Sequence, residues 1–162
     1  MSAAIFVIAA ALILVFWALG AYNRLVGLRA AVLHHLQVLL QTWMAQAQMI
    51  DARLAPYGPV DGANSAWMGV DEETQRWRAL ALSARQFMHC CEALASTAPR
   101  LASQDDVASV RTARQLFEAN WRNLRDAHAD LAGNAVPEDL QSQWAQHELL
   151  LKDRLKAYNA AA

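Results

Sequence analysis

The sequence has little of what builds a reactive or cross-linked site. Its 162 residues include two cysteines, four prolines and six glycines, and the formal net charge is −1. So few prolines and glycines exclude a collagen-like or low-complexity chain, and frequent leucine, alanine and tryptophan exclude wholesale disorder. The near-zero charge argues against a nucleic-acid-binding protein, because such proteins usually carry a basic patch or stripe. We therefore expect a folded protein without a nucleic-acid partner.

Motifs for metal binding and catalysis are absent as well. Zinc sites usually pair cysteines a few residues apart and add two ligands downstream, whereas Cys90 and Cys91 are adjacent and have no second cluster. His147-Glu148 begins like a zincin motif, but Leu151 stands where the second histidine is needed. The sequence also lacks a Glu-x-x-His pair, a haem-attachment motif and a glycine-rich phosphate loop. It predicts no enzyme activity, no cofactor and no metal.

What the sequence does contain is a long apolar start. Apolar residues make up 56% of the chain, and residues 1–21 hold 19 of them. Residues 3–21 carry no charge, and such a segment forms about 28 Å of helix, close to the hydrocarbon thickness of about 30 Å. Trp17 and Tyr22 lie at its end, where aromatic rings prefer the headgroup interface. We predict a single transmembrane helix over 3–21 that acts as a signal anchor.

A cleaved signal peptide is the main alternative to this anchor. Signal peptides usually begin with a basic segment and have an apolar core of about 7–15 residues, whereas only Met1 and Ser2 precede the longer apolar run here. Arg24 and Arg29 follow the run, so the positive-inside rule places the N-terminus outside and the domain in the cytoplasm. The alternative orientation leaves the domain in the periplasm.

The rest of the chain, 22–162, shows helical spacing of apolar residues in four stretches and no strand-like alternation. The predicted helices cover about 22–54, 71–98, 104–132 and 137–160. A loop rich in proline and glycine is predicted at 55–70, and the other connections are short, which favours antiparallel neighbours. The predicted fold is all-α: an N-terminal single-pass transmembrane helix that continues into an antiparallel up-and-down four-helix bundle.

Each predicted helix has one apolar face, at spacings of three, four or seven residues, which is expected to face the interior of the bundle. The first comprises Leu25, Leu28, Val32, Leu36, Leu39, Trp43, Ala47, Ile50 and Leu54. The others comprise Trp77, Leu80, Ala84, Phe87, Cys91 and Leu94, then Val107, Val110, Phe117, Trp121, Leu124 and Leu131, then Leu140, Trp144, Leu151, Leu155 and Tyr158. Pro99 is expected to end the second helix, and Ser103 to cap the third, with Asp106 three residues later.

One stretch resembles a known family. The run Tyr22-Asn23-Arg24-Leu25-Val26-Gly27-Leu28-Arg29 is similar to the Tyr-Asn-x-Leu-Val-x-Leu-Arg signature of LemA-family proteins, and Tyr158-Asn159 resembles a Tyr-Asn element in a late helix of that family. The chain departs from the family at Ala30, where asparagine is usual, and 31–54 lacks the family's Ile-Asp-Val and Pro-Asn-Leu-Val elements. The resemblance implies a bacterial, membrane-tethered helical bundle that acts by interaction.

The same run is the candidate site. Tyr22 and Arg29 are seven residues apart, hence on one side of a helix, and both suit the lipid headgroup region. The predicted membrane-interface motif comprises Trp17, Tyr22, Asn23, Arg24, Leu25, Val26, Leu28 and Arg29.

The expected partners are the lipid bilayer and either another protein or a second copy of the chain. The apolar stripe on the first helix could pair with that of a second copy, as in a coiled coil. The expected function is that of a scaffold or partner-binding protein without catalysis. A ligand-sensing or signalling accessory bundle tethered to the membrane is the alternative, and an enzyme whose histidines hold a metal inside the bundle is a third possibility.

Overall fold

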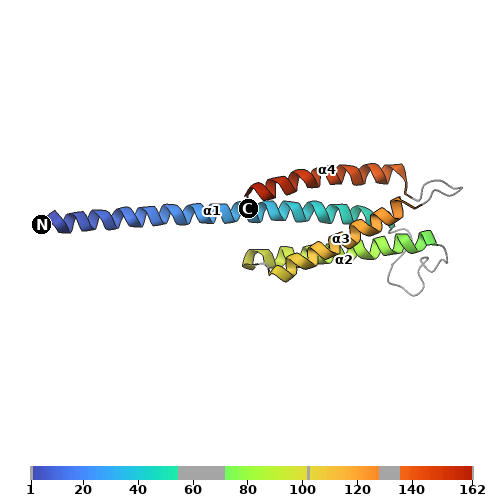
Figure 1. Ribbon diagram of the computed structural model, residues 1–162, viewed down its shortest axis with the longest axis horizontal. Coiled ribbons are helices and arrows are strands. Elements are labelled where there is room, and N and C mark those ends of the chain that lie inside the picture. Colours follow the sequence, from blue (N-terminus) through green and yellow to red (C-terminus); the bar gives the residue numbers. More distant parts are fainter. Residues whose placement is uncertain (1, 55–71, 102, 128–135, 162) are drawn as a thin grey trace.

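In the computed structural model, the described residues are 2–54, 72–101, 103–127 and 136–161, and nearly all of them are helical (Figure 1). The four helices are α1 (Ser2–Leu54), α2 (Glu72–Leu101), α3 (Gln104–Arg125) and α4 (Glu138–Ala161). No β-strand occurs in these residues, so the prediction of an all-α chain with four helices is confirmed. The predicted loop 55–70, Asp71 and Leu131 lie outside the described residues.

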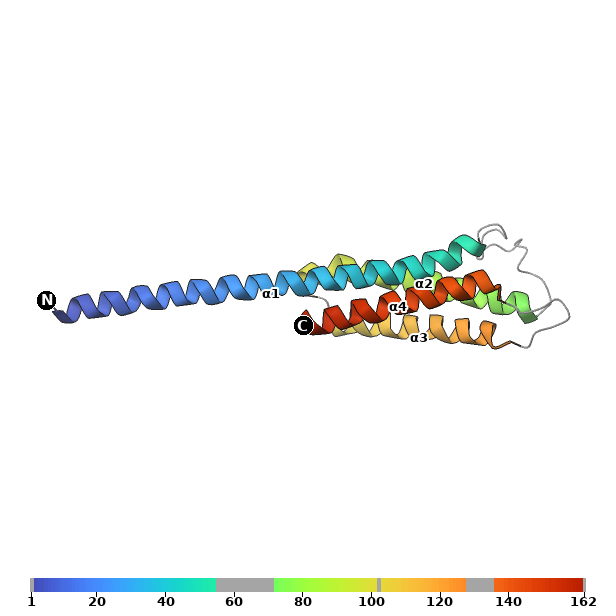
Figure 2. The same ribbon diagram turned by 90° about the horizontal axis from the view of Figure 1, so that it is seen from above.

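α1 is a single helix of 53 residues, with no break between its apolar start and its C-terminal half. At the rise of an α-helix it is about 80 Å long. Its N-terminal half stands apart from the other helices, and its C-terminal half lies alongside them (Figures 1 and 2). We call residues 2–30 of α1 the stalk and the rest of the described chain the bundle. The sequence lets α1 run this far because none of its residues is a proline.

The bundle is assembled around the C-terminal half of α1. α2 packs against α1 and α3, and α4 packs against α1. Both views show α4 running back along α1, so that the C-terminus lies beside the middle of α1 (Figures 1 and 2). Two ion pairs tie these helices together: Arg85 of α2 lies 2.8 Å from Asp51 of α1, and Arg53 of α1 lies 3.9 Å from Asp139 of α4.

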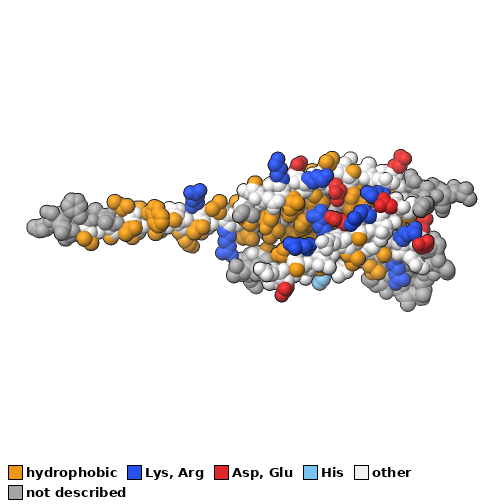
Figure 3. Space-filling model, viewed as in Figure 1, with side chains coloured by type: hydrophobic (Ala, Val, Ile, Leu, Met, Phe, Trp, Pro, Cys, Tyr) orange, Lys and Arg blue, Asp and Glu red, His pale blue; other side chains and the backbone are white. Residues whose placement is uncertain are grey.

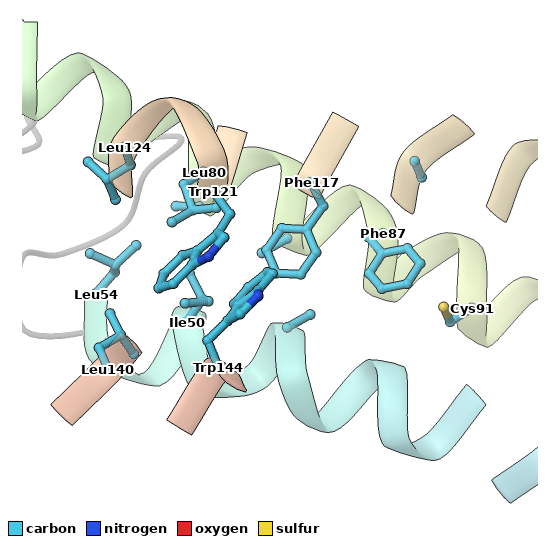
Figure 4. Packing of buried hydrophobic residues seen from close by; sticks show 14 of the residues in the cluster. Ile50, Leu54, Leu80, Phe87, Cys91, Phe117, Trp121, Leu124, Leu140 and Trp144 are labelled. Carbon is cyan, nitrogen blue, oxygen red and sulfur yellow. The ribbon is translucent and has the colours of Figure 1, made fainter. Parts of the chain in front are cut away.

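One apolar cluster, with side chains from all four helices, forms the core (Figure 4). Phe87 of α2 is at its centre, with its ring centroid 5.7 Å from that of Phe117 on α3 and 6.0 Å from that of Trp43 on α1. Trp144 of α4 completes the set, 5.2 Å from Phe117 and 4.2 Å from Trp121. These rings bury a large apolar area, so we expect them to dominate the stability of the bundle.

Most of this core follows the predicted apolar faces, but four predicted positions do not. Leu25 and Leu28 are 65% and 51% exposed, because no other helix extends along the stalk (Figure 1). Val107 and Leu155 are 44% and 40% exposed at the end of the bundle where α3 begins and α4 ends. The prediction that these four residues face the bundle interior is therefore wrong. On α1 the buried face starts at Leu36, which packs against the core cluster.

One of the predicted helix ends is found where the sequence places it, and two are not. The Ser103 side chain accepts a hydrogen bond from the Asp106 backbone N–H, and the Asp106 carboxylate accepts one from the Ser103 N–H, so the predicted cap of α3 is confirmed. α2 continues past Pro99 to Leu101, because a proline in the last turn removes only one hydrogen bond. α3 ends at Arg125, where Asp126 places a carboxylate at the unfavourable end of the helix dipole.

Candidate functional site

All eight residues of the predicted membrane-interface motif lie on the stalk. The structure gives them one shared setting: Trp17, Tyr22, Leu25, Val26 and Leu28 are 49–73% exposed, and Asn23, Arg24 and Arg29 are exposed too. Figure 3 shows many apolar side chains on the coloured part of the stalk, with basic side chains projecting from it. The motif is therefore a surface of one helix and not a pocket formed between helices.

The stalk is long and apolar enough to cross a membrane. By length and composition, α1 is the one helix of the described chain that meets this requirement, and its apolar window has no buried residues. A signal sequence near an N-terminus has the same properties. The exposed apolar surface continues beyond the predicted span of 3–21 as far as Leu28, because Leu25, Val26 and Leu28 contact no core.

Charge is unevenly distributed along α1. No Asp or Glu precedes Asp51, so the first fifty residues carry only the cations Arg24 and Arg29 and the histidines His34 and His35. The structure brings a second group of cations to the same region, since α4 ends beside the middle of α1 (Figures 1 and 2). This group comprises Lys152, Arg154 and Lys156, all exposed. Cations near the C-terminal end of a helix also interact favourably with the helix dipole.

Three buried polar atoms of the bundle are further candidates for ligand contact. Trp43 Nε1, Gln46 Nε2 and His147 Nδ1 are buried and have no hydrogen-bond partner among the residues that the structure describes. Gln46 is only 4% exposed, and an unpaired buried amide costs about 1–3 kcal/mol, so these atoms need a water, a ligand or a shifted side chain. Gln46 is not among the predicted apolar-face residues, although its spacing, three residues after Trp43 and four before Ile50, could have indicated that it is buried.

Arg114 lies at the edge of this interior region. Its guanidinium carbon is 4.8 Å from the centroid of the Trp43 ring, and its Nε donates a hydrogen bond of 2.6 Å to Glu118. The cation therefore links α3 to α1 through an aromatic face, and the carboxylate balances its charge. Elsewhere on α2, an arginine pairs with an acid of the same helix, as in the Arg76–Glu72 ion pair.

The cysteines and histidines do not converge on a metal site within the described residues, where no group of three or more metal-ligating side chains is found. Cys91 is fully buried in the core cluster, Cys90 is half-buried, and His89 is exposed. Burial, together with the neighbouring Cys90, raises the pKa of the Cys91 thiol to about 12. A thiol with so high a pKa stays protonated near neutral pH, which makes it a poor nucleophile and a poor metal ligand.

Two depressions lie between α2 and α3. One is lined by Glu72, Arg76 and Asn120, and the other by Gln86, Cys90 and Asp105, among others.

Comparison of the chain with protein-family models, with curated proteins and with solved structures finds no match. The function is therefore proposed from the stalk, the bundle and their charges.

Proposed function

We propose that the chain is a single-pass membrane protein in which the stalk anchors an antiparallel up-and-down four-helix bundle, and that the bundle acts as a scaffold or partner-binding unit without catalysis. One observation carries this proposal. The same continuous helix, α1, has an exposed apolar N-terminal half and a C-terminal half that contributes to the core. Anchor and bundle are therefore joined rigidly, with no flexible linker between them.

The cost of exposing the apolar surface of the stalk to water supports its proposed location in a membrane. Large apolar side chains between Val7 and Leu28 are 49–73% exposed, and so large an apolar surface is unfavourable in water. A lipid bilayer removes that cost, and a helix already satisfies its own backbone hydrogen bonds, as a bilayer requires. The antiparallel arrangement is supported by the directions of the helices in both views (Figures 1 and 2).

Membrane extraction of the full chain tests the anchor. The protein should stay with membranes after alkaline carbonate washing and should keep its N-terminus, as a cleaved signal peptide would not. Leu14→Lys should weaken insertion, because a lysine at the centre of a spanning helix costs about 3 kcal/mol. Leu82→Lys, at an exposed leucine of the bundle, is the matched control and should leave insertion unchanged. Release of the unmodified chain by carbonate would refute the anchor.

For the orientation, we propose an outside N-terminus and a cytoplasmic bundle, since Arg24 and Arg29 follow the span. A bacterial inner membrane is the setting that the similarity to LemA-family proteins supports. Gln143→Cys places a thiol at an exposed position of α4, whereas Cys91 is buried and Cys90 is half-buried. An impermeant thiol reagent should leave this variant unlabelled in intact spheroplasts and label it after lysis. Labelling of intact cells would place the bundle in the periplasm.

The proposed role of the bundle is to bind another protein or a second copy of the chain. Crosslinking in native membranes, followed by purification of the full chain, should recover one abundant protein or a second copy. Recovery of the monomer alone would contradict it.

A ligand-sensing bundle is the second candidate function. The unpaired atoms of Trp43, Gln46 and His147 favour it, because a polar ligand could satisfy them. A periplasmic bundle together with a ligand-dependent rise in melting temperature would establish it in place of the scaffold.

A further inference from the structure

We infer that the outer face of α2 and α3 binds the same face of a second copy of the chain, so that two anchored bundles form a parallel dimer. This inference rests on the proposed function, because the shared membrane fixes how two copies can meet. It goes further by naming the partner as a second copy and by naming the surface that binds it.

This face carries a strip of uncharged side chains, which we call the α2–α3 strip. On each helix its residues recur at spacings of three and four, so they lie on one side of that helix. All of them are exposed or partly exposed, and they comprise Gln75, Ala79, Leu82, Gln86 and Cys90 of α2 and Ser109, Thr112, Leu116, Asn120 and Asn123 of α3. All but Leu82 and Leu116 line the two depressions between the helices.

Charged side chains lie around the strip and not on it. Glu72 and Arg76 line one end of the first depression, and Asp105 lines the second, nearer the stalk. Exposed Glu92 and Arg111 lie to the sides. The core of a protein interface is likewise depleted of charge relative to the rest of the surface. A partner can therefore cover the strip without burying an unpaired charge, which would be costly.

A hydrogen bond sets the register of α2 against α3, which run in opposite directions (Figures 1 and 2). The Asn120 side-chain amide donates to the Ala79 carbonyl at 3.2 Å, so these two residues lie at the same height. Counting three residues along each helix from this pair brings Leu82 to within one residue of the height of Leu116. Both leucines are exposed, Leu82 by 41% and Leu116 by 46%. The strip thus has one apolar contact point on each helix, at one height.

A shared membrane makes these two points complementary. Both stalks enter the bilayer from the same side, so a twofold axis between two copies runs along the membrane normal. Because α1 continues from the stalk into the bundle, the bundle helices run roughly along that axis. Rotation about the axis keeps every residue at its height and places α2 of one copy opposite α3 of the other. Leu82 then packs against Leu116 of the second copy, and Leu116 against its Leu82.

The same counting matches the polar part of the strip. Amides and hydroxyls both donate and accept hydrogen bonds, so they can pair with one another across the axis. The facing pairs, each within one residue of equal height, are Gln75–Asn123, Ala79–Asn120, Gln86–Thr112 and Cys90–Ser109. Apolar side chains therefore meet apolar ones and polar side chains meet polar ones, which is the complementarity that a symmetric dimer requires.

The area of the strip agrees with a dimer that forms in the membrane. The strip is about 22 Å long and about 20 Å wide, so two copies face to face bury about 900 Å². Proteins that are free in solution form only weak complexes through so small an area. Anchoring both copies in one bilayer raises their local concentration and fixes their orientation, as a linker between two modules does, so a small interface is sufficient there.

Disulfide formation between two differently tagged full chains tests the predicted heights. One chain carries Leu82→Cys, the other carries Leu116→Cys, and both carry Cys90→Ser and are expressed in the same membrane. Mild oxidation should join the two chains. The matched control combines Leu82→Cys with Asn123→Cys, which lies on the same side of α3 but about 10 Å further along it, beyond the reach of about 7 Å between the Cα atoms of a disulfide. This pair should give several-fold less crosslinked product.

Substitutions in the strip test its contribution to binding. Leu116→Glu should weaken association of the full chain in phosphatidylcholine vesicles at least about tenfold, because each carboxylate would be buried against a leucine. Energy transfer between labelled copies gives the association. Leu149→Glu, at a leucine of α4 that is 64% exposed, is the control and should leave it unchanged. A mixture of Leu82→Arg and Leu116→Glu chains should associate again, because the arginine of one then faces the glutamate of the other, and a folding defect would not be rescued in this way.

The outcomes separate this inference from the proposed function. Equal crosslinking at both cysteine pairs, or equal association of Leu116→Glu and the wild type, would overturn the α2–α3 dimer. Recovery of a different protein, with no second copy, would overturn the dimer while supporting the proposed partner-binding role. A chain that does not remain in the membrane would overturn the anchor and the dimer together.

Discussion

The indole rings of Trp121 and Trp144 lie stacked, with centroids 4.2 Å apart and an angle of 8° between their planes. Trp121 belongs to α3 and Trp144 to α4, whereas the helix pairs whose backbones pack most extensively are α1–α2, α1–α4 and α2–α3. Phe117 of α3 also contacts Trp144, at 5.2 Å between centroids. Aromatic side chains, and not close backbones, therefore join α3 to α4.

Trp144→Ala should consequently destabilise the bundle strongly. Trp144 is 7% exposed, and truncating a buried tryptophan to alanine costs about 3–5 kcal/mol through lost burial and the cavity left behind. The measurement is urea unfolding of the full chain in detergent, followed by far-UV circular dichroism. Trp17→Ala is the control, because Trp17 is 73% exposed on the stalk, and it should change the free energy of unfolding by less than about 0.5 kcal/mol. Equal effects of both substitutions would contradict the packing described here.

Helical spacing in the sequence predicts which face of each helix is buried but not how far its neighbours extend. The period of an α-helix marked Leu25 and Leu28 as part of the same face as Ile50, and all three do lie on one stripe of α1. Only Ile50 is buried, because the other helices do not reach the stalk. Burial at the ends of a face depends on the lengths of other helices, which no local pattern contains.

Gln46 shows the opposite case, a polar residue that is buried. Its position on the apolar stripe marks it as buried, but its polarity argues for exposure, and the polarity was misleading. The cations near the middle of α1 could be predicted in part, because Arg24 and Arg29 follow the apolar run in sequence. That the C-terminal cations of α4 lie along the same helix depends on how α4 runs back along α1, which only the structure provides (Figures 1 and 2).

Ser103→Ala should lower the stability of the bundle by about 1 kcal/mol. The serine side chain satisfies the Asp106 N–H, which is otherwise one of the unpaired donors at the start of α3. Ser109→Ala is the control on the same helix, because the Ser109 hydroxyl only donates to the Asp105 carbonyl, which the helix already uses. Chemical unfolding of the two variants side by side gives the difference. If Ser109→Ala is as damaging as Ser103→Ala, the effect does not come from capping.

A double-mutant cycle on Arg85 and Asp51 should reveal a coupling of about 0.5 kcal/mol. The pair joins α2 to α1 at 2.8 Å, and each side chain is 35% exposed, so water screens the attraction only in part. The cycle uses Arg85→Gln, Asp51→Asn and the double variant. For comparison, Arg53 and Asp139 lie 3.9 Å apart with more than half of each side chain exposed, and their coupling should not differ measurably from zero. A reversed order of the two couplings would show that exposure does not govern these pairs.

Alkaline pH should destabilise the bundle through Cys91. Burial raises the pKa of its thiol from an ordinary value of 9.0 to about 12. Above pH 9 the unfolded chain loses the thiol proton while the folded chain keeps it, so the unfolded state binds fewer protons and stability falls as the pH rises toward 12. Between pH 8.5 and pH 10.5 the loss should be up to about 2 kcal/mol. Cys91→Ala removes this contribution, so the variant should lose less stability than the wild type over the same interval, although it is less stable at neutral pH. Urea unfolding of both proteins at the two pH values measures how much stability each one loses. Comparing the two losses cancels the contribution of other groups that titrate in this range, because both proteins contain them. Parallel pH dependence in wild type and variant would mean that the Cys91 thiol ionises as readily in the folded bundle as in the unfolded chain.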